Sequence, residues 1–455
     1  MNKSKEIEET VLEKITPSPL DRSKLNTIIA RISEKVQHEL AQRDLNATIE
    51  LVGSTAKDTY LRGDLDIDLF LVYPPKTLRE DMATQTISIG RNLLSKTEEC
   101  YAEHPYIRGY FKSYLVELVP CYQLSNAREK QSAVDRTPLH TEYILQHIDE
   151  DHKQEIRLFK QFLKGIGCYG AEAEVQGFSG YLCELLILYY KTFHNLISQA
   201  QTWKKGLVIA LNMDNPPSFP EPLTVIDPVD HERNVASAVV LETFNRFIRA
   251  NKAYIERPSV NFFFPKPVIP WSISRMRKSL STQSFQYLGV VFPKPSLIPE
   301  TLIPQIRKTC RSIKKECKSY GFKVHDVRYE IVFNKNLIYI IIKTDPNPLP
   351  PTYIHTGPPI KLHKNTEEFN KKWRNNPEVI TEPFEKDGRT YVELKRSYQH
   401  IDAFLKEKLT TFSLGKNLDG IINTAYEIVD LESLLKKELA VFWTRYLDRK
   451  KSWER

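Results

Sequence analysis

Apolar residues near the start of the chain follow first a helical and then a strand-like spacing. Residues 1–46 are predicted to be mostly helical, because apolar positions recur there at intervals of three and four. The recurring positions are Leu25, Ile28, Ile29, Ile32 and Val36. Residues 47–52 are predicted to form a strand that ends at the turn Gly53-Ser54, and residues 64–72 a second strand closed by two prolines.

Further along, short strand-like runs follow one more helical segment. Residues 77–99 have helical spacing, whereas 106–111 and 114–119 have the composition of strands, and the last of these runs stops at Pro120. Together these elements predict a small mixed sheet flanked by helices.

The middle of the chain is predicted to be helical. Helical spacing dominates residues 150–200 and 235–255, with a proline-rich connection between them. Prolines become dense again over 257–300, which suggests a domain boundary.

Beyond residue 270, strands and helices are predicted to alternate. Strands are expected at 284–292 and 324–344, with a basic helix at 302–320 between them. A helix at 365–375 and a strand at 389–395 precede helices that run to the end. This order favours an α+β arrangement, and the chain contains no internal repeat and no low-complexity segment.

Composition changes this picture modestly. With 455 residues the chain is long enough for about three domains, and its 41% hydrophobic content can supply several cores. The net charge of +8 suits a polyanionic partner, although many basic proteins bind none. The six cysteines form no CxxC pair and no zinc-like cluster, so we expect reduced thiols and a cytoplasmic protein. We expect no signal peptide and no membrane span, since the longest apolar run, Tyr181 to Tyr190, is short and contains Glu184.

Two aspartates in the second predicted strand are the first candidates for chemistry. Residues i and i+2 of a strand point to the same face, so Asp66 and Asp68 face away from Leu65, Ile67 and Leu69. Two like charges this close repel by about 1–4 kcal/mol. A fold that keeps them usually gains a divalent cation with oxygen ligands.

The turn before this strand has the residue types of a phosphate site. Gly53 permits close backbone approach, Ser54 offers a hydroxyl and an N–H to an anion, and Lys57 lies about one helical turn later. Alone, a Gly-Ser pair is usually an ordinary loop, and a lone Asp-x-Asp is usually a solvated strand edge. Their occurrence in this order, followed by an apolar strand, favours a nucleotidyltransferase site.

Glu117 is a third candidate carboxylate. It lies in an apolar predicted strand, where a single carboxylate is poorly placed unless it is paired or bound to metal. Alone it is better explained by a partly exposed strand face shared with Leu115 and Val119. Beside a strand that carries Asp66 and Asp68, it would complete three carboxylates able to hold two magnesium ions about 4 Å apart.

The order of Gly-Ser, Asp-x-Asp and a third carboxylate resembles the polymerase-β-like nucleotidyltransferase superfamily. Longer stretches within the first 240 residues or so are similar to the archaeal, class I CCA-adding enzymes, which are tRNA nucleotidyltransferases. These stretches are Tyr101-Ala-Glu-His-Pro-Tyr106, Val119-Pro-Cys-Tyr122, Ser132-Ala-Val-Asp-Arg-Thr-Pro138, Tyr169-Gly-Ala-Glu172, Gly177-Phe-Ser-Gly-Tyr-Leu-Cys-Glu-Leu-Leu186, and Asp227-Pro-Val-Asp230 with Arg233-Asn234-Val235-Ala236. Beyond residue 300 the similarity is looser, at Pro304-Gln305, Gly357-Pro358-Pro359 and Leu414-Gly415-Lys416-Asn417. Class II signatures are not evident.

The resemblance implies roles for the matching residues. The family's catalytic, metal-binding carboxylates fall on Asp66, Asp68 and Glu117. Its triphosphate contacts fall on Ser54, Lys57, His140, Lys160 and Tyr169. The residue that helps to read the incoming base falls on Arg233.

Four of these residues also have an ordinary interpretation. His140 would be a surface histidine, Lys160 a solvated lysine, Tyr169 a packed ring at a helix end, and Arg233 the salt-bridge partner of Asp230. Each ordinary interpretation is favoured alone, and only their joint occurrence favours the functional one.

The sequence departs from the family pattern at three positions. The family commonly has Glu where Asp66 stands and Asp where Glu117 stands, so oxygen ligation is retained but each reach changes by one methylene. It often has Arg where Lys57 stands, so a bidentate phosphate contact would become a point charge.

The basic helix at 302–320 is a candidate RNA contact. Its basic residues are Arg307, Lys308, Arg311, Lys314, Lys315 and Lys318. With Tyr320 and Phe322 nearby, they could follow an RNA backbone, but such a helix can equally be a solvated face. The resemblance favours RNA, since the family's C-terminal region grips the tRNA acceptor stem and T arm by A-form shape.

We therefore predict a multidomain α+β protein that adds CCA to the 3′ end of tRNA, using CTP and ATP and releasing pyrophosphate by two-metal nucleotidyl transfer with Mg²⁺. The predicted domains are a polymerase-β-like palm (1–148), a helical, nucleotide-binding central domain (149–267) and a tRNA-binding body and tail (268–455). The predicted partners are the tRNA acceptor stem, T arm and 3′ end, with no membrane; a homodimer stays open.

Three alternatives to this prediction remain. One is a poly(A) or oligoadenylate synthetase of the same superfamily, and another is a small-molecule nucleotidyltransferase. The third is a catalytically inactive RNA-binding relative.

Overall fold

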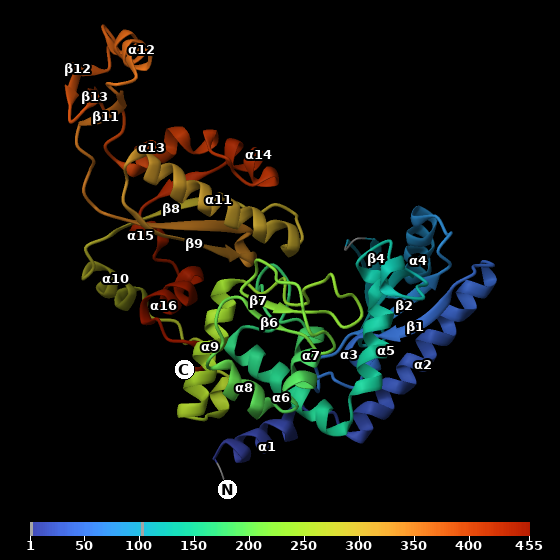
Figure 1. Ribbon diagram of the computed structural model, residues 1–455. Helices are drawn as coiled ribbons and strands as arrows, with labels where there is room; N and C mark the ends of the chain where they lie inside the picture. Colours follow the sequence, from blue (N-terminus) through green and yellow to red (C-terminus); the bar gives the residue numbers. More distant parts are fainter. Residues whose placement is uncertain (1–2, 102–103) are drawn as a thin grey trace. The chain divides into compact units, whose positions relative to one another are not determined.

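The computed structural model describes residues 3–101 and 104–455 (Figure 1). Two residues of the family-like stretch at 101–106, Ala102 and Glu103, lie outside this part of the chain. The chain forms two compact units: Met1–Pro267 with Lys450–Arg455, and Val268–Arg449.

The first unit contains a five-stranded mixed sheet, as the sequence predicts. Its strand order is β1-β2-β5-β4-β3; β2 and β5 are parallel and the other neighbours are antiparallel. The strands are β1 (Thr48–Val52), β2 (Ile67–Tyr73), β3 (Ser95–Tyr101), β4 (Pro105–Phe111) and β5 (Tyr114–Tyr122). The helices α1 (Lys3–Ile15), α2 (Pro19–Gln42) and α4 (Arg79–Leu93) match the predicted helical segments, and α2 and α4 bury their apolar faces in the core of the sheet.

Several element boundaries differ from the sequence prediction. Strand β2 begins at Ile67 rather than residue 64, because Leu61 and Asp64 pair in a turn. The helix predicted over 77–99 ends at Leu93, and an exposed edge strand follows.

Strand β5 continues through Pro120 instead of ending there. Its pairing with β4 stops at Leu118, so from that point β5 pairs with β2 alone among the residues that the structure describes. A proline lacks an N–H, and it is tolerated where one edge of the strand is unpaired.

The helical part of the first unit packs around a large aromatic core. Its helices are α5 (Thr137–His147), α6 (Glu150–Ile166), α7 (Gly180–Tyr190), α8 (Phe193–Ala200) and α9 (Leu241–Glu256). A short parallel pair, β6 (Leu207–Ile209) and β7 (Leu223–Val225), lies in the connection to α9. Helix α6 begins at the capping side chain of Asp149 and ends at Gly167, whose φ of 68° suits glycine. Its buried Phe159 and Phe162 contact Phe193 of α8.

The second unit contains two antiparallel sheets with helices, which agrees with the α+β prediction. The order of the larger sheet is β14-β8-β10-β9, and that of the smaller is β11-β13-β12. Their strands are β8 (Gln286–Pro293), β9 (Val324–Val332), β10 (Leu337–Thr344), β14 (Glu427–Val429), β11 (Thr352–Pro359), β12 (Val379–Lys386) and β13 (Arg389–Lys395). The helices are α10 (Ile273–Ser281), α11 (Pro299–Tyr320), α12 (His363–Trp373), α13 (Ile401–Lys408), α14 (Lys416–Thr424), α15 (Leu431–Leu434) and α16 (Ala440–Asp448).

Two expectations from composition can be compared with the structure. All six cysteines are buried free thiols. Among residues 3–101 and 104–455, no helix is both long and apolar enough to cross a membrane.

Candidate active site

The three candidate carboxylates lie on neighbouring strand positions. Strands β2 and β5 pair in parallel with Asp68 directly opposite Glu117, and Asp66 stands one residue before β2. Ile67 and Leu69 are fully buried on the other face. The alternation read from the sequence therefore correctly separates the carboxylate face from the core face.

Burial and mutual repulsion raise the pKa values of these carboxyl groups. Burial, then the charge of Asp66, raises the pKa of Asp68 to about 6. Burial, then Asp68 and Asp66, raises the pKa of Glu117 to about 7, against the lowering effect of Arg108. The pKa of Asp66 is raised as well, by partial burial of its carboxyl group and by the charge of Asp64. The protein alone therefore disfavours the fully charged set, whereas a divalent cation would favour it.

The glycine turn lies directly against this set. Gly53 has a φ of 72°, and a Cβ built on it would overlap with Oδ2 of Asp68, so only glycine fits there. Ser54 follows in α3 (Gly53–Ala56), a single helical turn. The backbone that would meet a phosphate is thus next to the carboxylate face.

The donor set suits a hard cation, because it consists of carboxylate oxygens. Asp68 and Glu117 are in register, and the carboxylates interact electrostatically as a group. Within the part of the chain that the structure describes, no three His, Cys, Asp or Glu side chains enclose one metal position by themselves. The three carboxylates fit an open site, whose other ligands would come from phosphate oxygens and water.

Lys57 and Lys160 converge on a buried glutamate from α7. Nζ of Lys57 lies 2.5 Å from Oε2 of Glu184, and Nζ of Lys160 lies 3.3 Å from its Oε1. Lys160 also donates to the carbonyl and the hydroxyl of Thr59, each at 3.1 Å. The side chain of Lys160 is only 2% exposed, so its interpretation as a solvated lysine is wrong.

His140 is also buried, so its interpretation as a surface residue is wrong. Its Nε2 lies 2.8 Å from Oδ2 of Asp227, and its ring stacks on Tyr181 with 4.2 Å between centroids. Burial lowers the pKa of His140 against the raising effect of Asp227, and the ring donates its Nε2–H to this carboxylate.

Arg233 pairs with the same aspartate, at 2.9 Å from Oδ2 of Asp227, and not with Asp230 as the ordinary interpretation holds. Asp230 instead binds Lys130 and Arg136, at 2.7 and 2.6 Å. Burial opposes ionisation of Asp227, but the bonds from His140 and Arg233 outweigh it and lower its pKa to about 2. Arg233 remains about one-third exposed.

Tyr169 lies at the edge of the lysine pair. It bridges to Phe178, and a Cβ added at Gly180 would lie 3.3 Å from its hydroxyl and 3.8 Å from Nζ of Lys160. The ammonium of Lys164 stands 5.4 Å from the ring centroid. The ring of Tyr169 is half-buried, which agrees with its interpretation as a packed ring. Its hydroxyl and the amino group of Lys160 both lie close to Gly180.

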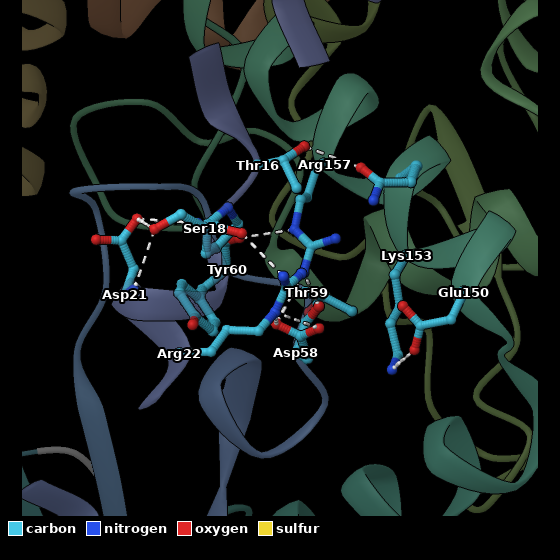
Figure 2. A network of polar contacts seen from close by, with 12 residues as sticks. Thr16, Ser18, Asp21, Arg22, Asp58, Thr59, Tyr60, Glu150, Lys153 and Arg157 are labelled. Atoms are coloured by element: carbon cyan, nitrogen blue, oxygen red, sulfur yellow. Dashed lines mark hydrogen bonds and ion pairs between the residues drawn. The ribbon is translucent and has the colours of Figure 1, made fainter. Parts of the chain in front are cut away.

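The loop that carries Lys57 is held from both sides by arginines (Figure 2). Asp58, with a φ of 51°, accepts from Arg22 of α2 at 3.2 Å and from Arg157 of α6 at 2.9 Å. Arg157 also donates to the carbonyls of Asp58 and Tyr60. Since Lys160 lies one turn after Arg157, helix α6 contacts three successive residues of this loop.

Sequence reasoning missed several residues that organise the site. They are Thr59, Arg157, Glu184 and Asp227. The signal that identified Glu117, a lone carboxylate in an apolar segment, was also present at Glu184 in the apolar helix α7. The other three carried no such signal: the partners of Thr59 and Arg157 lie about a hundred residues away, and Asp227 pairs with the distant His140 as well as with the nearby Arg233.

Comparison with known proteins first defines the class. Residues 33–140 match the family model "Nucleotidyltransferase domain". Residues 154–264 match "tRNA nucleotidyltransferase, second domain", and residues 284–430 match "CCA-adding enzyme, C-terminal domain". The class is therefore a nucleotidyltransferase.

Comparison with whole proteins then identifies the family. The chain is 34% identical to a CCA-adding enzyme from Methanosarcina barkeri, over 93% of this chain and 94% of that protein. It is 32% identical to a CCA-adding enzyme from Archaeoglobus fulgidus, over 96% and 97% of the two chains. Among solved structures, the RNA terminal uridylyl transferase Cid1 aligns with a TM-score of 0.47 at 14% identity, over 59% of this chain and 99% of that chain. The chain belongs to the CCA-adding enzyme family.

Proposed function

We propose that this protein adds C, C and A in turn to the 3′ end of tRNA, using CTP and ATP and releasing pyrophosphate. The observation that carries the proposal is the position of Asp68 opposite Glu117, next to the Gly53 turn, in a chain of this family. The proposed domains are a palm at 1–148, a nucleotide-binding domain at 149–267 and a tRNA-binding region at 268–455.

In the proposed mechanism, Asp66, Asp68 and Glu117 hold Mg²⁺ and define where the reacting groups meet. The cation, when bound, supplies Lewis-acid stabilisation at the α-phosphate and favours ionisation of the attacking 3′ hydroxyl. Both contributions need carboxylates that stay ionised, and cation binding would ensure this by offsetting their repulsion.

The remaining site residues would hold the nucleotide. In this proposal, the triphosphate is bound by Ser54, Lys57, Lys160, His140 and Tyr169. Positive charge there would stabilise the leaving pyrophosphate. Arg233, which is partly exposed and fixed by Asp227, would contact the incoming base.

The proposal is tested with a tRNA transcript that lacks its terminal CCA. With CTP, ATP and Mg²⁺, the product should be longer by three nucleotides; with CTP alone, by two; with EDTA, the substrate should stay unchanged.

A long homopolymer would support a poly(A)-type enzyme instead. Extension by only CC or only A would indicate a partial activity shared with a second enzyme. A folded preparation that binds tRNA without incorporation would support the inactive relative. We also propose the cytoplasm as its place of action, since all six cysteines are free thiols.

A further inference from the structure

Glu184 is the only acidic residue of helix α7 and is almost completely buried. Its side chain is 1% exposed, in a helix whose sequence, GYLCELLILYY, is otherwise apolar or aromatic. A lone buried carboxylate is costly unless it is paired. Burial opposes its ionisation, but the ammonium groups of Lys57 and Lys160 outweigh this and keep the pKa of Glu184 below its usual value.

Both oxygens of Glu184 accept hydrogen bonds. Oε2 accepts from Lys57 at 2.5 Å, while Oε1 accepts from Thr59 at 2.7 Å and from Lys160 at 3.3 Å. The two lysines come from segments more than a hundred residues apart, the loop after α3 and helix α6. Only a carboxylate can serve all three, because an amide would turn an NH₂ toward at least one donor.

The cluster carries more positive than negative charge. The amino groups of two lysines face one carboxylate, and the three side chains are 6%, 2% and 1% exposed. Burial lowers the pKa of Lys160 and Glu184 raises it, so a bound anion would further favour its charged form. Excess positive charge in a buried place favours an anionic ligand. Lys57 lies four residues after Gly53, whose backbone packs against Asp68, so the cluster adjoins the segment that meets the carboxylates proposed for catalysis.

We propose that Glu184 is a positioning residue that holds Lys57 and Lys160 at a fixed spacing for the nucleotide triphosphate. This inference rests on the proposed function. Glu184 does not touch the reacting atoms; it sets the positions of the two ammonium groups and leaves one positive charge for the ligand. Thr59 completes the arrangement by donating to Glu184 while accepting from Lys160.

The test measures nucleotide binding without tRNA, by calorimetric titration with ATP and with inorganic tripolyphosphate. Glu184→Gln should weaken binding of both probes roughly tenfold or more, the size of a lost charged hydrogen bond. Glu184→Asp keeps the charge with a shorter reach and should lie between wild type and Glu184→Gln. In steady-state assays, Glu184→Asp should raise KM for CTP and ATP with kcat nearly unchanged, because the residue acts on binding.

Glu155→Gln is the matched control. Glu155 is a half-buried glutamate of α6 that accepts from the backbone N–H of Phe193 at 2.7 Å, away from the lysines. This variant should bind both probes like wild type. It measures how the loss of one half-buried glutamate charge in the same unit, by itself, affects binding of the two probes.

Each outcome separates the inference from the function on which it rests. If wild type does not bind ATP, the proposed function fails. If wild type binds ATP and folded Glu184→Gln binds tripolyphosphate equally or more tightly, the positioning role is overturned while the function stands. If Glu184→Gln does not fold, wild-type affinity of Glu184→Asp for both probes overturns the inference just as directly.

Discussion

At the scale of single residues, the exchange of Asp and Glu between positions 66 and 117 has a simple explanation. Asp66 is exposed at the start of β2, whereas Glu117 is half-buried on β5. Relative to the common family pattern, the extra methylene has moved from the exposed position to the more buried one. The set keeps the same total side-chain length, and its longer side chain now comes from the more buried position.

Asp68→Asn should abolish most nucleotide incorporation while the protein stays folded. The variant keeps the shape of the side chain but loses the charge needed for a cation, so incorporation should fall on the order of 10²–10³-fold or more. Binding of tRNA should stay within about twofold, because phosphate contacts elsewhere dominate affinity. Thermal stability should be at least that of wild type, since a repelling buried charge is lost. Gel-based incorporation, filter binding and a thermal melt check the three expectations.

Asp64→Asn is the control for this substitution. Asp64 lies four residues earlier, with a side chain 56% exposed in a surface pair with Lys164. Surface pairs contribute about 0–1 kcal/mol, so activity and stability should hardly change. Retained turnover in Asp68→Asn would refute the metal-binding role.

At this scale, sequence can predict residues whose chemistry conflicts with their immediate neighbours. Asp68 and Glu117 stand out as charges within apolar strands, and the structure brings them into register. Asp227 does not stand out, because its partners His140 and Arg233 can be identified only once the fold has brought them together. Taken alone, His140 would therefore be interpreted as a surface histidine, although the structure buries it.

At the scale of elements, helix α6 holds the loop after α3 through two residues one turn apart. Arg157→Met should remove the ion pair between α6 and Asp58 and the hydrogen bonds from α6 to the carbonyls of Asp58 and Tyr60. Loss of one partner of a half-buried charge pair should destabilise the first unit by about 2–3 kcal/mol. KM for nucleotide should rise as well, because Lys57 lies on this loop. A thermal melt and steady-state kinetics measure the two effects.

Arg246→Met is the matched control for the loss of an arginine. Arg246 of α9 donates to the carbonyl of Gly167 at 2.8 Å and is about one-third exposed. Its loss should lower stability less and leave KM unchanged. Equal effects of the two substitutions on KM would contradict a specific role for Arg157.

The contact between helices α1 and α9 should make stability depend on pH. The hydroxyl of Tyr254 donates to Glu8 at 3.2 Å. Burial raises the pKa of Glu8 to about 7; the bond from Tyr254 and the charge of Lys5 lower it, and Glu155 of α6 raises it. Because the folded-state pKa of Glu8 lies above the unfolded one, the stability that Glu8 contributes is greatest below about pH 4.5 and is lost as pH rises through about 7.

Glu8→Gln should remove this dependence. After allowance for solvent screening, wild type should lose about 1–2 kcal/mol from this group as pH rises from about 5 to 7.5, and the variant should lose less. Urea titrations of wild type, Glu8→Gln and the exposed control Glu9→Gln across this range measure the difference. Parallel curves for wild type and Glu8→Gln would show that Glu8 has an ordinary pKa.

The elements themselves were predictable where one signal dominated. Clear helical spacing located α2 and α11, and alternation located β2. Strand β3 was missed because its residues are mostly polar and exposed, so no apolar period marks them. Pro120 was taken as a stop because pairing on one side only cannot be read from the sequence.

At the scale of the whole molecule, the net charge of +8 raises the question of where RNA is bound. Helix α11 buries its apolar side and exposes Lys308, Arg311, Lys315 and Lys318, spaced three and four residues apart along one stripe. Such a stripe can follow a phosphate backbone without reading bases.

Affinity for tRNA should depend steeply on salt, and part of that dependence should come from this stripe. In wild type, affinity should fall steeply between about 50 and 200 mM salt if several phosphates are contacted. The triple variant Arg311→Gln, Lys315→Gln, Lys318→Gln should bind more weakly, with a slope of log affinity against log salt shallower by roughly one to three units.

The matched variant Lys24→Gln, Arg31→Gln, Lys35→Gln removes three exposed charges from one side of α2 and lowers the net charge equally. Because only charges that meet phosphates change the slope, this second variant should keep the wild-type slope. Equal slopes for all three proteins would show that α11 is a solvated face, and a flat response in wild type would argue against an RNA-binding surface of this kind anywhere on the molecule.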